Sequence, residues 1–177
     1  MKIKSLIIML LSSIGLMRSP AAVAADSNTL YMDVPAGRVV IRMRPDLAPN
    51  HVARIKQLVN QGFYNGVPFH RVIEGFMAQT GDPTGTGTGG SGRNIAAEFS
   101  NARHVRGTVS MARATDPNSA DSQFFIVFAD APFLDRQYSI WGEVVSGMEH
   151  IDAIRKGEGN DGRVTNPDRI IRMHMAR

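Results

Sequence analysis

The sequence predicts a mainly β domain in which the strands form a closed antiparallel barrel with two short helices. Three observations favour this class. Short apolar segments recur with turn-rich links between them, the first and last predicted strands alternate apolar and polar residues, and only two segments have a helical pattern. Because residues 170–175 alternate at the end of the chain, we expect the last strand to seal the edge beside the first.

The first predicted element is a β-hairpin with strands at residues 30–34 and 38–43. Apolar residues recur at every second position in both segments, and Pro35-Ala36-Gly37 stands between them. Alternation with a period of two on either side of a Pro/Gly turn is typical of a hairpin with one buried face.

A helix is predicted next, at residues 49–60. It starts with a proline, which is tolerated in a first helical turn. Val52, Ile55 and Val59 fall on one face, as in an amphipathic helix packed on a core. Gly62 is well placed to end it.

The remainder of the chain contains short predicted strands and one more short helix. All eight Phe residues lie between positions 63 and 133, together with most of the glycines. Short apolar runs with glycine-rich links are typical of strands joined by turns. The predicted strands lie at residues 69–73, 76–78, 108–111, 124–129, 139–145 and 170–175. The second predicted helix lies at residues 148–154.

Residues 1–25 are predicted to be a secretory signal, and residues 26–177 the mature domain. Two lysines precede an apolar run, and small residues follow before a cleavage site near Ala24 or Ala25. The alternative is an uncleaved membrane anchor, but the run of about 12 residues is shorter than the ~20 needed to span a bilayer. We therefore expect an exported protein with no membrane association once the signal is removed.

The charge and the cysteine content exclude several classes of protein. The chain has a formal net charge of +4, with 20 Lys and Arg against 16 Asp and Glu. Three of those cations lie in residues 1–25, which contain no acid, so the mature domain has a charge of +1. A nearly neutral domain gives no case for nucleic-acid binding. The absence of cysteine excludes disulfides, thiol catalysis and cysteine-ligated metal sites.

Three patterns imitate functional motifs. Residues 85–92 match G-x-G-x-x-G, but no helical pattern follows to receive a phosphate, so a flexible surface loop is the preferred interpretation. The five histidines have no metal-ligand spacing, and we expect no metal site. Ser122 stands at the entry to an apolar strand and not in a G-x-S-x-G elbow, which disfavours Ser-His-Asp chemistry.

Two segments place polar residues or unusual apolar runs where chemistry could occur. Within residues 69–82, Arg71 and Gln79 stand among Phe, Val, Ile and Met. Residues 124–128 are all apolar, so a strand there is apolar on both faces. One face would be covered by the barrel core, and the other could form a groove for an apolar ligand.

The first of these segments closely resembles the signature of the cyclophilin-type peptidyl-prolyl cis-trans isomerases, F-H-R-V-I-x-G-F-M-x-Q-x-G-D. The similarity extends over nearly the whole mature chain. It implies an eight-stranded antiparallel barrel with a helix over each end. It also implies isomerisation of X-Pro peptide bonds without a cofactor or a metal. Supporting similarities lie at residues 46–49, 107–112, 122–126, 133–135, 142–144 and 147–148.

The resemblance implies the residues of the site. The catalytic residues would be Arg71 and Gln79, the latter orienting the rotating carbonyl or holding the arginine in place. The walls of the proline pocket would be Phe76, Met77, Phe125 and Leu134. Contacts to the substrate backbone and to the residue before proline would come from Gln79, Ala112, Gln123 and the backbone of Arg113.

Three positions depart from the residues usual in the family. Arg113 stands at a usual Asn, but it is the backbone there that contacts substrate. Phe133 replaces a usual Trp and Tyr138 a usual His, and both remain predicted substrate-binding residues. The exported Gram-negative members share these two changes, which favours a periplasmic location. Because Phe133 lacks the indole N–H that donates to cyclosporin, we expect weak cyclosporin binding.

A fixed guanidinium among apolar residues suits the twisting of an X-Pro bond. The rotation barrier of a peptide bond is ~18–20 kcal/mol, and no covalent bond has to form or break. The twisted nitrogen gains a lone pair, to which the donor-only arginine can donate. The sequence thus predicts an isomerase, which we expect to be a monomer, that assists the folding of unfolded or partly folded proline-containing polypeptides.

Two other functions stay open. A non-catalytic proline-peptide-binding or chaperone module could keep the same groove, although the retained Arg71 argues against it. A small-molecule carrier barrel of the lipocalin kind would need a cavity. We expect Phe124 and its neighbours to fill that interior instead.

Overall fold

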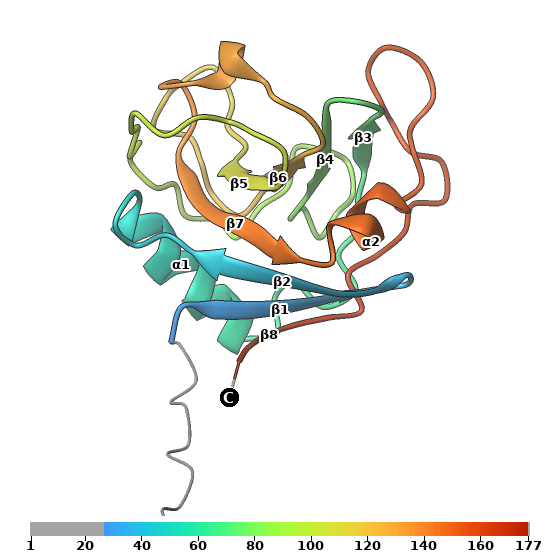
Figure 1. The fold of residues 1–177 in the computed structure, drawn as a ribbon, viewed down its shortest axis with the longest axis horizontal. Coiled ribbons are helices and arrows are strands. Elements are labelled where there is room, and N and C mark those ends of the chain that lie inside the picture. Colours follow the sequence, from blue (N-terminus) through green and yellow to red (C-terminus); the bar gives the residue numbers. More distant parts are fainter. Residues whose placement is uncertain (1–26, 177) are drawn as a thin grey trace, which may run out of the picture.

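The computed structural model describes residues 27–176, which form one eight-stranded antiparallel sheet with two α-helices (Figure 1). The predicted signal, residues 1–25, lies outside the described residues. The strands are β1 (Thr29–Val34), β2 (Gly37–Met43), β3 (Arg71–Ile73), β4 (Met77–Thr80), β5 (Thr108–Met111), β6 (Phe124–Val127), β7 (Ile140–Ser146) and β8 (Arg172–Met175). The helices are α1 (Pro49–Asn60), α2 (Met148–Asp152) and the short 3-10 helix η1 (Pro132–Leu134).

The predicted elements are present, with small shifts at their ends. The hairpin β1–β2 is confirmed, with Leu30 opposite Ile41, and α1 has the predicted bounds. The helix η1 was not predicted, because three residues are too few to show a helical period. Within residues 27–176, no helix has the length and apolar character needed to cross a bilayer.

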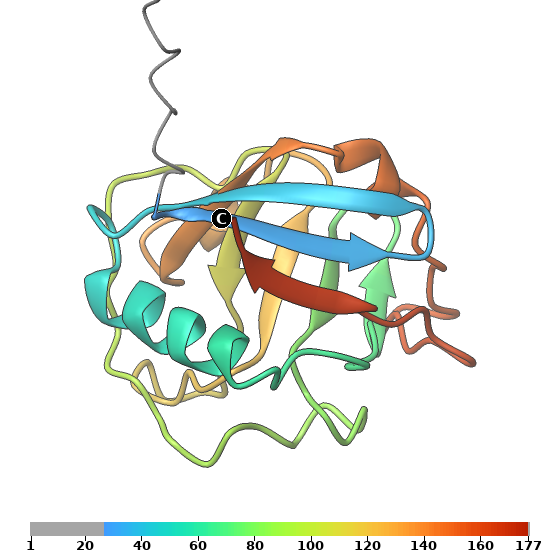
Figure 2. The same ribbon diagram turned by 90° about the horizontal axis from the view of Figure 1, so that it is seen from below.

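The sheet curls into an open half-barrel, so the prediction of a closed barrel is wrong. The strand order β3-β4-β6-β5-β7-β2-β1-β8 leaves β3 and β8 as the two edges. As expected, β8 pairs with β1, with Leu30 opposite Met175, but it forms no ladder with β3. Figure 2 shows this last strand beside β1, with α1 lying next to it.

The gap between the two edge strands is covered by loop backbone. The edges are only three and four residues long, too short to meet along a ladder. The chain crosses the gap by isolated bridges, Pro68 to Arg169 and Arg71 to Arg163. The N–H of Val72 donates to the carbonyl of Gly162 at 2.7 Å. The edge groups are thereby satisfied without a closed barrel.

The interior of the half-barrel is filled by side chains. Alternate residues of β1 and β2 point into it, which accounts for the period-two pattern of the sequence. Phe124 and Trp141 are fully buried at its centre, with their rings edge to face and 5.3 Å apart. Each such side chain stabilises the fold by roughly 1.5–3 kcal/mol. Phe124 and its neighbours fill the interior, as expected, where a small-molecule carrier would need a cavity.

The strand β6 is apolar on both faces because it separates two hydrophobic clusters. Phe124 and Ile126 belong to the main core. Phe125 and Val127 face the other way, into a smaller cluster with Met77, Ala131 and Leu134. One face of β6 is thus covered by the core, as expected, and the other forms an apolar surface on the outside of the sheet. The candidate site lies on that outer surface.

Candidate active site

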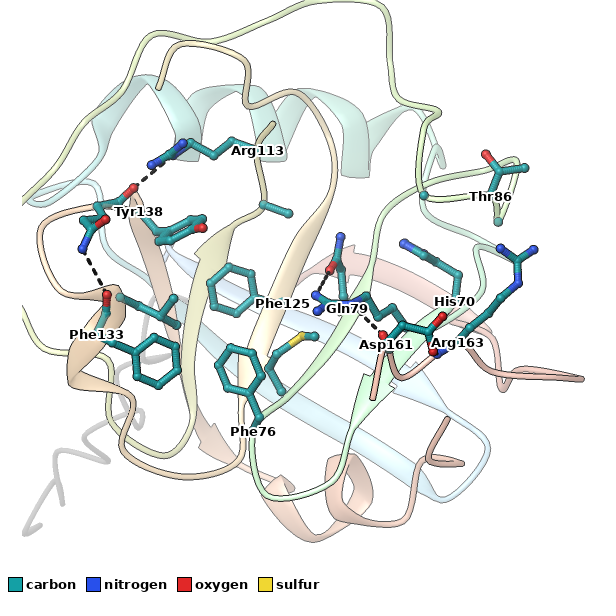
Figure 3. A pocket seen from close by; sticks show the side chains of 17 residues that line it. His70, Phe76, Gln79, Thr86, Arg113, Phe125, Phe133, Tyr138, Asp161 and Arg163 are labelled. Atoms are coloured by element: carbon teal, nitrogen blue, oxygen red, sulfur yellow. Dashed lines mark hydrogen bonds between the residues drawn. The ribbon is translucent and has the colours of Figure 1, made fainter. Parts of the chain in front are cut away.

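A cleft of about 560 Å³ lies over the outer apolar cluster and the polar residues beside it (Figure 3). Figure 3 shows Phe76, Phe125 and Phe133 at one end and His70, Asp161 and Arg163 at the other. The structure brings ten of the eleven predicted site residues to this cleft: Arg71, Phe76, Met77, Gln79, Ala112, Arg113, Phe125, Phe133, Leu134 and Tyr138. Gln123 is the exception, and it contacts Gln79 from an adjoining hollow.

The apolar end of the cleft is a slot with a firm floor and an exposed rim. Met77, Phe125 and Leu134 are 2%, 5% and 6% exposed and belong to one packed cluster. Phe133 is 63% exposed and meets Phe76 with ring centroids 5.4 Å apart. A ring-sized apolar group placed here would contact side chains on several sides and lose its contact with water.

The ring of Phe125 is supported by two aromatic neighbours. The buried imidazole of His104 is stacked on it with centroids 6.2 Å apart. Tyr138 meets it edge to face at 5.8 Å, and the guanidinium of Arg113 lies 4.8 Å from the Tyr138 ring centroid. Arg113 also donates to the carbonyl of Gln137 at 3.1 Å. These contacts hold the wall of the slot in one position.

His104 is itself held between a carboxylate and a hydroxyl. Its Nδ1 lies 3.1 Å from Asp135 Oδ1 and its Nε2 lies 3.0 Å from Ser110 Oγ. Burial lowers the pKa of His104 below its ordinary value, although Asp135 opposes the shift. The trio resembles a Ser-His-Asp arrangement, but Ser110 is fully buried and no substrate can reach its hydroxyl. It serves as support for Phe125.

The polar end of the cleft is organised around the guanidinium of Arg71. Its Nε donates to the backbone carbonyl of Asp161 at 2.9 Å, and its Nη1 donates to Gln79 Oε1 at 3.2 Å (Figure 3). Two of its donor groups are thereby occupied. Arginine has five N–H donors and no acceptor, so others remain for a substrate. The side chain is half-buried, where a hydrogen bond is stronger than in bulk water.

His70 precedes this arginine and lines the same end of the cleft. It is 7% exposed. Burial lowers its pKa, Arg71 and Arg163 act in the same direction, and Asp82 and the backbone of Pro68 oppose the shift. The imidazole is therefore neutral near pH 7, and Arg71 supplies the positive charge beside it.

Several residues that line the cleft were not predicted. Asp161 and Arg163 lie some 90 positions after Arg71, on the loop that covers the open seam. No sequence spacing relates them to it. Thr86 and Gly87 come from the glycine-rich segment, which was expected to be a flexible surface loop. That segment does lie on the surface, but its hydrogen bonds attach it to Asp82 and to Gln123.

The three patterns that imitate functional motifs form no phosphate, nucleophile or metal site among the described residues. Ser122 is fully buried, and its hydroxyl donates to the carbonyl of Gly81 at 2.8 Å. No helix follows the glycine-rich segment, as the sequence indicated. In residues 27–176 no group of His, Asp and Glu side chains is placed to hold a metal ion.

The fold is a curled antiparallel sheet, and the site is an arginine beside an apolar slot on the outer face of that sheet. Comparisons with known proteins show which family has this fold and site. Residues 29–175 match the family described as cyclophilin type peptidyl-prolyl cis-trans isomerase/CLD. The chain belongs to this family of enzymes, which confirms the resemblance seen in the sequence.

Named relatives cover most of the chain. A protein of Brucella suis biovar 1 (strain 1330) called "Probable peptidyl-prolyl cis-trans isomerase" is 53% identical, over 90% of this chain and 88% of its own length. The human "Peptidyl-prolyl cis-trans isomerase-like 3" is 42% identical, over 73% of this chain and 82% of its own. The chain is thus similar to isomerases from both bacteria and animals.

Solved structures give the same result. A cyclophilin of Hirschia baltica is 30% identical, with a TM-score of 0.75, over 84% of this chain and 74% of that chain. A cyclophilin-type isomerase of Cryptosporidium parvum, crystallised in the presence of the dipeptide Ala-Pro, is 28% identical, with a TM-score of 0.78. That match covers 84% of this chain and 99% of the other.

Proposed function

We propose that this protein catalyses the cis–trans isomerisation of X-Pro bonds in polypeptides, with Arg71 stabilising the twisted imide. One observation carries the proposal. A guanidinium held by Asp161 and Gln79 borders an apolar slot floored by Met77 and Phe125. Family membership supports the reaction class, and this geometry supports the roles of the residues.

The reaction needs a positioned donor more than it needs a reactive group. As the imide twists, conjugation is lost and the nitrogen becomes pyramidal and accepts a hydrogen bond. Arg71 donates to that nitrogen, and such a charge-assisted bond contributes ~1.5–3 kcal/mol. Only the part that is absent from the planar ground state accelerates the reaction. The enclosed slot strengthens it by excluding water.

The other predicted residues hold the substrate. The proline ring occupies the slot over Met77 and Phe125, with Phe76, Leu134 and the exposed ring of Phe133 around it. The residue before proline extends toward Ala112, the backbone of Arg113, and Gln123. Tyr138 closes the wall beside Phe125 and contacts the same stretch of substrate. Because Arg71 borders the slot, a proline ring seated there brings its imide nitrogen toward the guanidinium.

The proposed setting is outside the cytoplasm. Residues 1–25 would direct export and be cleaved near Ala24 or Ala25, leaving residues 26–177 as a monomer in the periplasm. Unfolded and partly folded exported chains with proline would be its substrates, because slow X-Pro isomerisation delays their folding. Intact mass of the protein recovered from the periplasm tests this. A mass that retains residues 1–25 would contradict it.

The isomerase assay tests the reaction and the role of Arg71 together. The exchange rate of a short Ala-Pro peptide is measured with the wild-type protein and with Arg71→Ala. We expect a clear rate enhancement that Arg71→Ala reduces by at least about tenfold, the effect of roughly 1.4 kcal/mol in the barrier. Rates for the two proteins that both equal the uncatalysed rate, with peptide binding retained, would leave the non-catalytic binding module, and an equal enhancement by both would overturn the role of Arg71.

A further inference from the structure

A continuous chain of hydrogen bonds leads from Arg71 to the glycine-rich loop. Arg71 Nη1 donates to Gln79 Oε1 at 3.2 Å, and Gln79 Nε2 donates to Gln123 Oε1 at 2.9 Å. Gln123 Nε2 in turn donates to the carbonyl of Gly87 at 3.0 Å and to that of Gly89 at 2.8 Å. The guanidinium is thus connected through two side-chain amides to two backbone carbonyls.

The two ends of this chain determine the orientation of both amides. A glutamine amide can turn either its oxygen or its nitrogen toward a neighbour. Arg71 can only donate, so Gln79 must present its oxygen to it. The carbonyls of Gly87 and Gly89 can only accept, so Gln123 must present its nitrogen to them. Each glutamine therefore has one favourable orientation, provided that the two carbonyls stay in place.

Those carbonyls are held by the carboxylate of Asp82. This side chain is fully buried and follows β4 by two residues. It accepts the backbone N–H of Thr84 at 2.8 Å, of Gly87 at 2.7 Å and of Gly89 at 3.0 Å, and also the hydroxyl of Thr84. Burial raises the pKa of Asp82, but the hydrogen bonds from Thr84, Gly89 and Gly87 together outweigh it and lower the pKa to about 2, so the side chain is ionised at any working pH. Without this anchor a loop of alternating glycines has many accessible conformations.

We propose that Asp82 is a positioning residue for Arg71, acting through the Gly87 and Gly89 carbonyls and the two glutamines. The inference rests on the proposed function of Arg71 and extends it to a buried carboxylate that lines no part of the cleft. The carboxylate holds the loop, the loop orients Gln123 and then Gln79, and Gln79 directs the guanidinium at the substrate. The G-x-G-x-x-G pattern serves as a scaffold for the catalytic arginine and not as a phosphate site.

The experiment uses Asp82→Asn in the full chain. The substitution keeps the shape but replaces one accepting oxygen with an NH₂ group, which cannot accept the loop N–H groups. We expect the kcat for an Ala-Pro peptide to fall by about tenfold, with little change in KM, because a small misplacement of a catalytic group lowers the rate steeply. The side-chain amide NMR resonances of Gln79 and Gln123 shift as well.

A double-mutant cycle separates positioning from general damage. If Asp82 acts through Arg71, then Asp82→Asn has no further effect on the rate in an Arg71→Ala background. The matched control is Glu98→Gln, since the Glu98 carboxylate also accepts two backbone N–H groups, those of Asn50 and His51 at the start of α1. We expect that control to lower stability while kcat and the glutamine resonances stay unchanged.

If the Asp82→Asn protein does not fold, Thr84→Val is a milder variant that weakens the same anchor. Thr84 is exposed, lies outside the cleft and loses its hydroxyl bonds to Asp82 and to Thr86, while its backbone N–H bond to Asp82 is kept. We expect a smaller fall in kcat, again absent in the Arg71→Ala background. Wild-type kcat in the folded variants, or the same fold-change with and without Arg71, would overturn the role of Asp82. An Arg71→Ala protein as fast as wild type would instead overturn the proposed function itself.

Discussion

Arg71 and Gln79 are register partners on the adjacent strands β3 and β4, and their side chains are hydrogen-bonded at 3.2 Å. Directly opposite residues on paired strands lie within reach of each other on one face of a sheet. The hairpin that contains the signature thus places Gln79 beside the arginine, while the orientation of its amide is set by Gln123 and the loop behind it. The direction of the guanidinium also depends on Asp161, which comes from the far end of the chain.

We expect Arg71→Lys to lose most of the activity although the charge is kept. A lysine has a compact ammonium on a flexible stem and cannot bond to Asp161, Gln79 and the substrate with the fixed fork of a guanidinium. The kcat for an Ala-Pro peptide falls by about tenfold or more, and KM changes little. Stopped-flow exchange rates check this. A lysine variant with wild-type kcat would show that charge alone suffices.

Phe125→Ala should affect both stability and binding. The ring is 5% exposed and packs between His104 and Tyr138, so its removal leaves a cavity. We expect the free energy of unfolding to fall by about 3 kcal/mol and the KM for proline peptides to rise. Urea denaturation and peptide titration measure the two effects. An unchanged KM in the folded variant would argue against a proline pocket at this ring.

Phe133→Trp should increase the affinity for cyclosporin. The Phe133 ring is 63% exposed, so an indole fits without overpacking and adds the missing N–H donor. One added hydrogen bond corresponds to about a tenfold lower Kd. Calorimetric titration of wild type and variant measures it, with Phe99→Trp, outside the cleft, as the control. No gain over that control would show that the indole donor is not what limits binding here.

The stability of the protein should fall as the pH drops below 7. His70 and His104 have pKa values lowered by burial from their ordinary value of 6.5. Near pH 6.5 the unfolded chain therefore binds protons that the folded protein does not, and the free energy of unfolding decreases with decreasing pH until the folded-state pKa values are reached. The carboxylates lower stability in the same direction but in a more acidic window, because their pKa values are lowered from 3.8 and their stabilisation is lost only as the pH falls below that value.

Urea denaturation at about pH 7.5 and about pH 5.5, at constant ionic strength, measures this dependence. The variant His70→Leu removes one of the two groups, and we expect a smaller difference in unfolding free energy between the two pH values. His174→Leu is the matched control, because His174 is only partly buried, at the edge strand β8. A pH dependence that is the same in all three proteins would show that His70 does not contribute to it.

Much of the fold follows from local patterns. The alternation in residues 30–34 and 38–43 identified the first hairpin, and the spacing of Val52, Ile55 and Val59 identified α1. Both patterns reflect which residues face the core, and the structure confirms both elements. The closure of the barrel failed as a prediction because it depends on how far two short edge strands extend toward each other. That distance is a property of the whole sheet.

The sequence by itself determined the family, the order of most elements, and the residue types that the cleft contains, because signature residues and periodicity are local properties of the chain. Only the tertiary structure decided that the sheet stays open, that Asp161 and Arg163 join the cleft across the seam, and that Asp82 holds the loop behind Gln123. These relationships join segments far apart in the chain. They depend on backbone carbonyls and N–H groups, which every residue carries and no sequence pattern records.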